Sequence, residues 1–239
     1  MAESETNILK IEGASDCVII GRLNRFVIEV LVKGNHYHAS TNNTGHLNEF
    51  IVAGRGAFCI PHQKPLKTDF RLFAIEERNF GALIDTQFQM SAFEKALQMG
   101  LVPWLEGYRM SRRNAPLDNS LIDYLLEGNG APIYLEVKSA VLRDGDYAMH
   151  PDCPSARGRK HIRDLTRLSR NGGKAIILFM AALPEVEAFK PNKSADPELC
   201  RLLLEARHAG VEIKALNIVY QPQGSFISLL NPDLPVKLE

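Results

Sequence analysis

The sequence has few cysteines, no long apolar run and no excess of either charge. Its four cysteines are widely spaced among 239 residues and form no Cys-x-x-Cys pair, which argues against a zinc site or a disulfide framework. The longest apolar run covers residues 175–183 and is far too short to cross a bilayer. Lys plus Arg and Asp plus Glu both number 28, so the zero net charge excludes a general polycation. A nucleic-acid partner would therefore need a local basic patch.

The first ten residues are polar and acidic, and they predict no signal peptide. Scattered, unpaired cysteines are typical of reduced thiols inside the cell. Both features favour a cytoplasmic protein with no membrane partner. The sequence leaves open whether the chain forms a homo-oligomer.

The residue pattern divides the chain into two parts near residue 86. The first part consists of short strands and glycine-rich turns, with one hairpin over 25–41 whose tip is Lys33-Gly34-Asn35 and another over 70–85 that turns at Arg78-Asn79. This pattern is typical of a small all-β barrel. The second part alternates helical spacing with buried strand runs in the order α-β-β-β-α-β-α-β, which predicts a mixed sheet with helices on its faces. We therefore expect one domain over residues 1–86 and a second over 87–239.

Three stretches of the second part have helical spacing, and two of them begin with recognisable caps. Ser155 precedes a helix that ends before Gly172-Gly173. Asp196 precedes a second helix whose first residue, Pro197, suits that position. We expect both caps to fix where these helices begin.

The stretch SLIDYLLEGNGAPIYLEVKS, residues 120–139, places three charges in two apolar runs joined by a turn. If the turn centres on Asn129-Gly130, the favoured pair for a short hairpin, Asp123 lies directly opposite Glu136. Lys138 follows Glu136 by two residues and points to the same face. The opposite face receives only apolar side chains and Tyr124, which predicts that it belongs to the core.

Opposed residues on neighbouring strands hold their Cβ atoms about 5 Å apart, so two carboxylates there repel each other. A hard divalent cation such as Mg²⁺ or Mn²⁺ would relieve this repulsion and leave positions for water and phosphate. Asp123, Glu136 and Lys138 together therefore predict a site for metal-assisted phosphodiester hydrolysis. The simpler interpretation is a solvated strand face, since Glu-x-Lys alone is common. A loop one residue longer or shorter would also turn Asp123 to the other face.

Residues 157–170 carry six Lys or Arg side chains against one acid, Asp164, on a chain of zero net charge. Such an excess indicates either a solvated helix face or a surface that binds phosphates. The helix start could also meet a phosphate through its backbone N–H groups. The predicted nucleic-acid-binding residues are Arg157, Arg159, Lys160, His161, Arg163 and Arg167.

Several stretches together resemble the sugar fermentation stimulation protein A (SfsA) family, over most of the chain. They are Asn43-Thr44-Gly45, LIDYLL with IYLEVKSAVL, and HPDCPSARGRKHIRDL, in which Arg157-Gly158-x-Lys160-His161 is the most specific. The resemblance implies a mixed α/β protein with an N-terminal OB-like β-barrel, followed by a PD-(D/E)xK nuclease-like domain whose mixed sheet is flanked by helices. It also implies DNA binding and an association with the regulation of sugar metabolism in bacteria.

The resemblance places the metal-binding acids and the catalytic lysine of that nuclease type on Asp123, Glu136 and Lys138. A further acid is implied on the first helix or the strand after it, for which Glu94 and Glu106 are candidates, and we favour Glu106 as a third metal ligand. An OB-like barrel also suggests stacking of bases on aromatic side chains. The aromatic residues available are Phe26, Tyr37, Phe58 and Phe70, although each is more often a core residue.

Three functions remain open from the sequence. The first is a metal-dependent DNA endonuclease, which the complete Asp-Glu-Lys set favours. The second is a DNA-binding regulator that keeps the nuclease framework without cleaving, which the zero net charge favours. The third, weaker hypothesis is a protein that binds a small molecule in the cleft between the domains.

Overall fold

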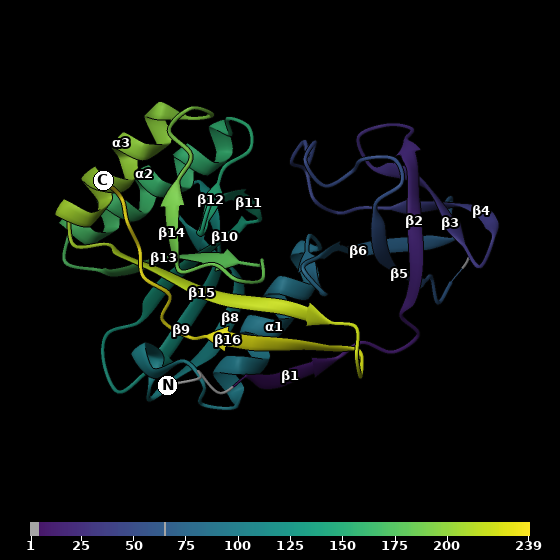
Figure 1. The fold of residues 1–239 in the computed structure, drawn as a ribbon. Coiled ribbons are helices and arrows are strands. Elements are labelled where there is room, and N and C mark those ends of the chain that lie inside the picture. The colour runs from purple at the N-terminus through teal and green to yellow at the C-terminus, as the bar shows by residue number, and fades with distance from the viewer. Residues whose placement is uncertain (1–4, 65) are drawn as a thin grey trace.

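The computed structural model describes residues 5–64 and 66–239, and it consists of a β-barrel beside a larger domain with a mixed sheet (Figure 1). The strands of the barrel follow one another as β4-β3-β2-β5-β6. A parallel pairing of β4 with β6 closes the barrel. The strands are β2 (Ser15–Arg22), β3 (Val27–Val32), β4 (Asn35–Ser40), β5 (Gly56–Pro61) and β6 (Phe70–Glu77).

Two predicted turns of this region are confirmed. Lys33 and Gly34 both have positive φ and join β3 to β4 through the pair Val32–Asn35, which is the geometry of a two-residue hairpin loop. Arg78 and Asn79 also have positive φ and join β6 to the next strand, β7 (Phe80–Leu83). These turns fix the register of both hairpins.

The sheet of the second domain has the order β7-β15-β13-β10-β9-β8 and is mixed. The central strands β10, β13 and β15 are parallel, whereas the outer pairings are antiparallel. The strands are β7 (Phe80–Leu83), β8 (Tyr108–Leu117), β9 (Ser120–Gly128), β10 (Ile133–Ala140), β13 (Lys174–Ala181), β15 (Glu212–Gln221) and β16 (Phe226–Asn231). Strand β13 is buried at every residue after Lys174, as expected for a parallel strand covered on both faces.

Helices cover both faces of this sheet. They are α1 (Thr86–Gln98), α2 (Ala156–Arg170), α3 (Pro197–His208) and a short 3-10 helix (Pro103–Leu105). Helices α2 and α3 pack together on one face, and α1 lies on the other (Figure 1). The predicted caps are confirmed, because Ser155 accepts the N–H of Gly158 and Asp196 accepts that of Leu199. Within the described residues, no helix has both the length and the apolar character needed to cross a membrane.

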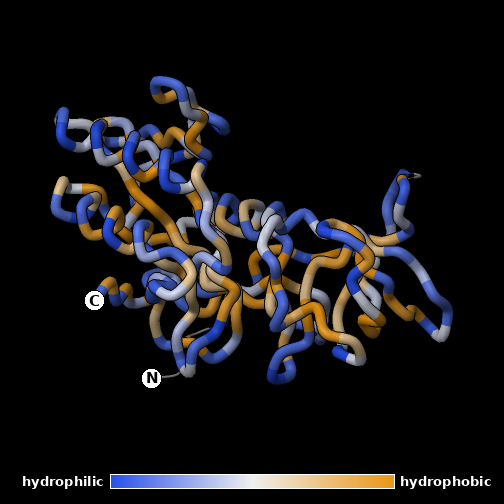
Figure 2. Tube along the Cα trace, turned by 90° about the horizontal axis from the view of Figure 1, so that it is seen from above, coloured by the Kyte–Doolittle hydropathy of each residue, from blue (hydrophilic) through white to orange (hydrophobic). Residues whose placement is uncertain are grey.

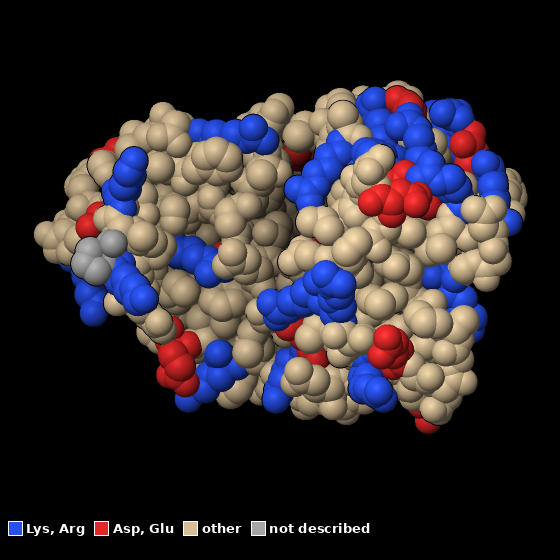
Figure 3. All heavy atoms as spheres, turned by 180° about the vertical axis from the view of Figure 1, so that it is seen from behind, with Lys and Arg blue, Asp and Glu red and all other residues tan. Residues whose placement is uncertain are grey.

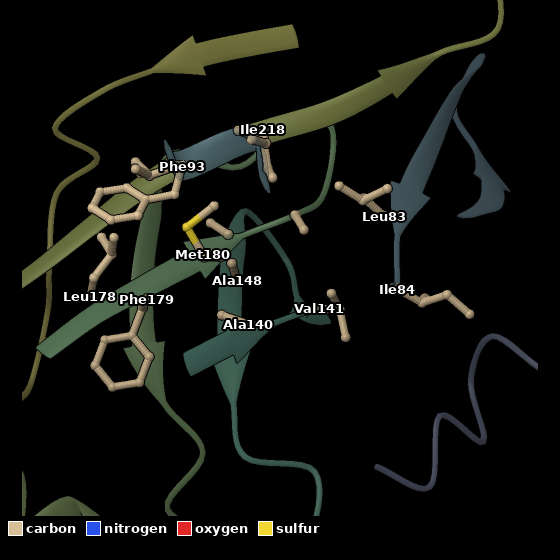
Figure 4. Close-up of a cluster of buried hydrophobic side chains, with 14 of the residues drawn as sticks. Leu83, Ile84, Phe93, Ala140, Val141, Ala148, Leu178, Phe179, Met180 and Ile218 are labelled. Carbon is tan, nitrogen blue, oxygen red and sulfur yellow. The ribbon is translucent and has the colours of Figure 1, made fainter. Parts of the chain in front are cut away.

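Hydrophobic segments run through the interior of both halves, while the turns at their ends are hydrophilic (Figure 2). Around β13 the core gathers side chains from both faces of the sheet, including Phe93 of α1 and Phe179 of β13 (Figure 4). Leu83 and Ile84, at the end of β7, extend this core to the point where the chain leaves the barrel. The two domains are therefore joined by continuous packing.

Two features depart from the sequence-based expectations. A small second sheet contains β11 (Leu142–Asp144), β12 (Tyr147–His150) and β14 (Ala188–Pro191), whose three or four residues are too few to show an alternating pattern. Strand β1 (Thr6–Lys10) pairs with β16 of the second domain. This pairing was not expected from the sequence, because the partner of β1 lies over 200 residues away and leaves no local signal.

Candidate active site

The β9–β10 hairpin has the predicted register. Its pairs Ile133–Leu126, Tyr134–Leu125 and Leu135–Tyr124 bring Asp123 and Glu136 to the next opposed positions. There the Val137 N–H donates to Asp123 Oδ2 at 2.8 Å, and the Asp123 N–H donates to Glu136 Oε2 at 3.4 Å. The two carboxylates therefore face each other where the two strands begin to separate.

Glu136 is almost completely buried, with 2% of its surface exposed, and it has two cationic or polar partners. The Lys138 ammonium donates to Oε1, and His161 Nδ1 of α2 lies 2.6 Å from the same oxygen. Burial raises the pKa of Glu136, but Lys138 and His161 outweigh this effect and hold the pKa below its usual value. Glu136 is therefore ionised at neutral pH.

The pKa of Asp123 is shifted in the opposite direction, because the effects that raise it outweigh those that lower it. Burial and the negative charge of Glu136 raise its pKa to about 6, although the Val137 N–H, Lys138 and His161 act against the shift. An ionised Asp123 is thus held in the structure at a cost in free energy. A cation between the two carboxylates would remove that cost.

Asp123, Glu136 and Lys138 line a cavity of about 320 Å³, which we call the carboxylate cavity. Segments from five places in the sequence enclose it: Thr44 of the barrel, the start of α1, the β9–β10 hairpin, His150 of β12, and the start of α2. Arg157 and Gly158 contribute the last of these walls. The cavity is therefore built jointly by both domains.

Two polar side chains beside the cavity have no signal in the local sequence. Gln89 of α1 is buried and donates through Nε2 to Leu83 O at 2.7 Å and to Ser139 Oγ at 2.9 Å. His150 Nδ1 lies 2.8 Å from Ser139 O. Burial and the nearby Lys138 charge lower the pKa of His150 to about 4, so its ring is neutral and Nδ1 donates to this carbonyl. Both side chains hold the backbone and hydroxyl of Ser139, next to Lys138.

The Asn-Asn-Thr-Gly segment of the barrel, residues 42–45, is anchored to the stretch that leads from the barrel into α1. Asn42 Nδ2 donates to Asp85 Oδ1 at 3.0 Å, and Asn43 Nδ2 donates to Ile84 O at 2.9 Å. A Cβ on Gly45 would lie 2.8 Å from Asp152 Oδ2, so a larger residue there would require the Asp152 side chain to shift. These contacts bring Thr44 to the wall of the carboxylate cavity.

Most cations of α2 make ion pairs within the chain. Arg159 contacts Asp196 and Glu198, Arg163 contacts Glu198, Lys160 contacts Asp164, and Arg167 contacts Asp118 and Asp164. His161 is committed to Glu136. Arg157 differs from them, because it is exposed, lines the carboxylate cavity and makes no ion pair with the described residues.

The two further acids considered from the sequence lie elsewhere. Glu106 is exposed at the end of the 3-10 helix, beside the turn of the β9–β10 hairpin, and it does not line the carboxylate cavity. Glu94 binds Tyr124 and Arg113 on the opposite face of the sheet. We therefore remove Glu106 from the set of metal ligands. Within residues 5–64 and 66–239, no cluster of three or more His, Cys, Asp or Glu side chains has the arrangement of a metal site.

The closed five-stranded barrel is an OB-like domain, and the mixed sheet with its flanking helices is a restriction-endonuclease-like domain. The match to the SfsA N-terminal OB domain covers residues 20–84, and that to the sugar fermentation stimulation protein RE domain covers residues 87–224. The chain belongs to the sugar fermentation stimulation protein family.

Relatives with the same architecture cover nearly the whole chain. Homologues from Pyrococcus furiosus and Archaeoglobus fulgidus are each 44% identical, over 92% and 96% of this chain and 95% and 98% of their own. A solved structure described as Pyrococcus furiosus SfsA in complex with Ca²⁺ has a TM-score of 0.92 and 42% identity, covering 97% of this chain and 99% of that one.

Proposed function

We propose that this protein hydrolyses DNA phosphodiester bonds with the help of a divalent cation. The observation that carries the proposal is the pair of opposed, buried carboxylates, Asp123 and Glu136, beside Lys138 in one cavity. A protein that only binds DNA has no need of two facing carboxylates, whose repulsion costs stability.

The donor atoms of this site fit a hard divalent cation such as Mg²⁺ or Mn²⁺. Such ions prefer oxygen ligands and often use only one or two carboxylates, with water and phosphate oxygens in the other positions. Glu136 Oε2 is the oxygen available for this purpose, because Lys138 and His161 both contact Oε1 and Oε2 accepts only the Asp123 N–H, at 3.4 Å. The raised pKa of Asp123 supports the assignment, since a cation would offset the burial of this carboxylate and its repulsion by Glu136, which together raise the pKa. The related structure that contains Ca²⁺ supports binding of a divalent cation as well.

When bound, the cation would lower the pKa of a water molecule and offset charge on the phosphate. The chain itself supplies the remaining groups. Lys138 holds Glu136 in place and presents an ammonium group to the negative charge that develops on the phosphate. Arg157, at the mouth of the cavity, is placed to contact a non-bridging phosphate oxygen.

A second candidate, DNA binding without cleavage, is favoured by one observation. Lys138 and His161 already compensate the charge of Glu136, so this carboxylate does not need a cation to remain ionised. In that case the site would hold DNA through Arg157 and the start of α2. The paired cations of α2, namely Arg159, Lys160, Arg163 and Arg167, would contact phosphates only after breaking their present ion pairs.

A cleavage assay on single- and double-stranded DNA, with Mn²⁺ and with EDTA, separates the two candidates. We expect cleavage that needs the metal and is abolished by Glu136→Ala, with DNA affinity retained, because the carboxylate opposes the phosphate when no metal is bound. Glu106→Ala is the matched control, since Glu106 lies outside the cavity, and it should cleave like the wild type. Wild-type protein that binds DNA but never cuts it supports the second candidate. Unchanged cleavage by Glu136→Ala rules out this site.

A further inference from the structure

The carboxylate cavity continues into a groove along the boundary between the domains. A neighbouring hollow of about 210 Å³ shares Thr44, Ser139 and His150 with it. A third hollow, of about 770 Å³, shares Gly45 and Cys153 with the second and ends at the loop that joins β2 to β3. Figure 3 shows the surface hollowed between the two halves, with Lys and Arg side chains on both sides. The candidate active site is thus connected to the barrel by open space.

The far end of this groove carries two arginines, Arg22 and Arg25. Nε and Nη2 of Arg22 are buried and donate no hydrogen bond to the described residues, which is costly for a guanidinium group. Burial lowers the pKa of Arg22, although Asp152 attracts its charge. Arg25 is exposed and donates one hydrogen bond, to Thr44 O at 3.0 Å. Arg22 therefore has two donors without a partner just below the surface of this hollow, and Arg25 has donors open to an anion in it.

The same loop exposes apolar surface. Phe26 is 45% exposed and Leu23 is 51% exposed, and the Arg25 guanidinium lies 5.4 Å from the centre of the Phe26 ring. Asn24 holds the loop in shape, because its Oδ1 accepts the N–H groups of Phe26 at 2.9 Å and Val27 at 3.1 Å. An exposed aromatic ring on a rigid loop, beside two cations, combines the two features that bind single-stranded nucleic acid.

We infer that the β2–β3 loop, residues 22–27, is a binding site for single-stranded DNA that leads the strand into the carboxylate cavity. Arg22 and Arg25 hold backbone phosphates, and Phe26 stacks on a base. The inference rests on the proposed function in one respect. The proposed function places the phosphate to be cut at Asp123 and Glu136, and so the strand is expected to run from the loop towards these residues.

The chemistry of the groove favours a single strand over a duplex or an acidic peptide. A duplex keeps its bases stacked inside, so it offers no free base to Phe26. An acidic peptide would use the cations but leave the aromatic surface without a matching partner. Asp152 also faces the groove, but its Oδ2 accepts the Leu47 N–H at 2.8 Å and so is already partly neutralised by a hydrogen bond.

Binding measurements in EDTA test the loop independently of cleavage. The probe is a fluorescein-labelled oligothymidylate of about 12 nucleotides, a length in the range that one OB domain binds. We expect Arg22→Gln with Arg25→Gln to weaken binding about tenfold or more. The slope of log affinity against log salt should fall by about 1.4, because each phosphate contact to a single strand contributes about 0.7. Phe26→Ala should weaken binding about tenfold and leave the slope unchanged, because stacking involves no counterion.

The matched control is Arg201→Gln with Arg207→Gln, which removes the same charge from the exposed face of α3. It should bind like the wild type, and thermal unfolding should show that all variants are folded. Wild-type affinity in both loop variants overturns the inference. If the loop variants lose as much affinity for a duplex of about 12 base pairs as for the single strand, the inference is also overturned. The loop would then bind the phosphates of any nucleic acid. Failure of metal-dependent cleavage alone contradicts the proposed function and leaves this binding result unaffected.

Discussion

Replacing Asp123 with Asn should make the metal-free protein more stable, although Asp123 is a predicted metal ligand. The reason is the cost of its buried negative charge: burial, followed by repulsion from Glu136, raises the pKa of Asp123 from 3.8 to about 6. Each pKa unit corresponds to about 1.4 kcal/mol, so ionised Asp123 costs the folded protein about 3 kcal/mol. Asn keeps the acceptor for the Val137 N–H and removes the charge.

The raised pKa of Asp123 also determines how the free energy of unfolding changes with pH. The folded protein holds the Asp123 proton more tightly than the unfolded chain, so its free energy of unfolding falls as pH rises from about 4 to about 6. Below about pH 4 the penalty is absent, because Asp123 is protonated in both states. The stabilising effect of Asp123→Asn should therefore be largest above pH 6 and small at pH 4.

Glu136→Gln is the contrasting variant. It should lower the free energy of unfolding by about 3 kcal/mol, because the partly buried Lys138 loses its counter-charge. A divalent cation at about 100 times its dissociation constant should stabilise the wild type by about 2.7 kcal/mol, and it should not stabilise either variant.

The measurement is urea denaturation at both pH values, with EDTA and with Mg²⁺. If Asp123→Asn is less stable than the wild type in EDTA above pH 6, the buried charge of Asp123 beside Glu136 does not destabilise the folded protein as described. That result would remove the main reason to expect a cation between the two carboxylates.

Two further outcomes are expected. Arg157→Ala should weaken DNA binding and lower the salt slope by about 0.9, the contribution of one phosphate contact to duplex DNA, without changing thermal stability; an unchanged slope would mean that Arg157 contacts no phosphate. Asp85→Ala should lower the free energy of unfolding in urea by about 3 kcal/mol, because this fully buried carboxylate binds Arg71 and accepts the Phe88 N–H at 2.8 Å. Stability equal to the wild type would show that this buried pair contributes nothing.

The position of the turn made the central residues of the site predictable from the sequence. The pairs of β9 with β10 have the register expected for a turn centred on Asn129-Gly130, and this register places Asp123 opposite Glu136 on the face of Lys138. The turn itself is not a two-residue loop, because the last pair is Leu126–Ile133 and neither Asn129 nor Gly130 has a positive φ. Local residue types also predicted where α2 and α3 begin, because Ser155 and Asp196 are favourable N-caps and act as such in the structure.

Contacts between distant segments were not predictable in this way. Gln89 and Thr44 reach the cavity only because α1 and the barrel fold against β10, and no local pattern reports that packing. The ion pairs of α2 were missed for the same reason, since Glu198 and Asp118 are far from the helix in sequence. Glu106 was misplaced because the chain passes through a 3-10 turn before β8, which leaves this residue at the wrong end of the sheet.

The pairing of β1 with β16 determines how the barrel is attached. The chain enters the barrel from β1 and leaves it through β7, and both of these strands belong to the sheet of the second domain. The barrel is thus an insertion with two tethers (Figure 1), and it cannot swing away on a single hinge. Cutting the chain near residue 86 would therefore leave β1 holding the fragments together, and a second domain made separately would have to include residues 6–10 to complete its sheet.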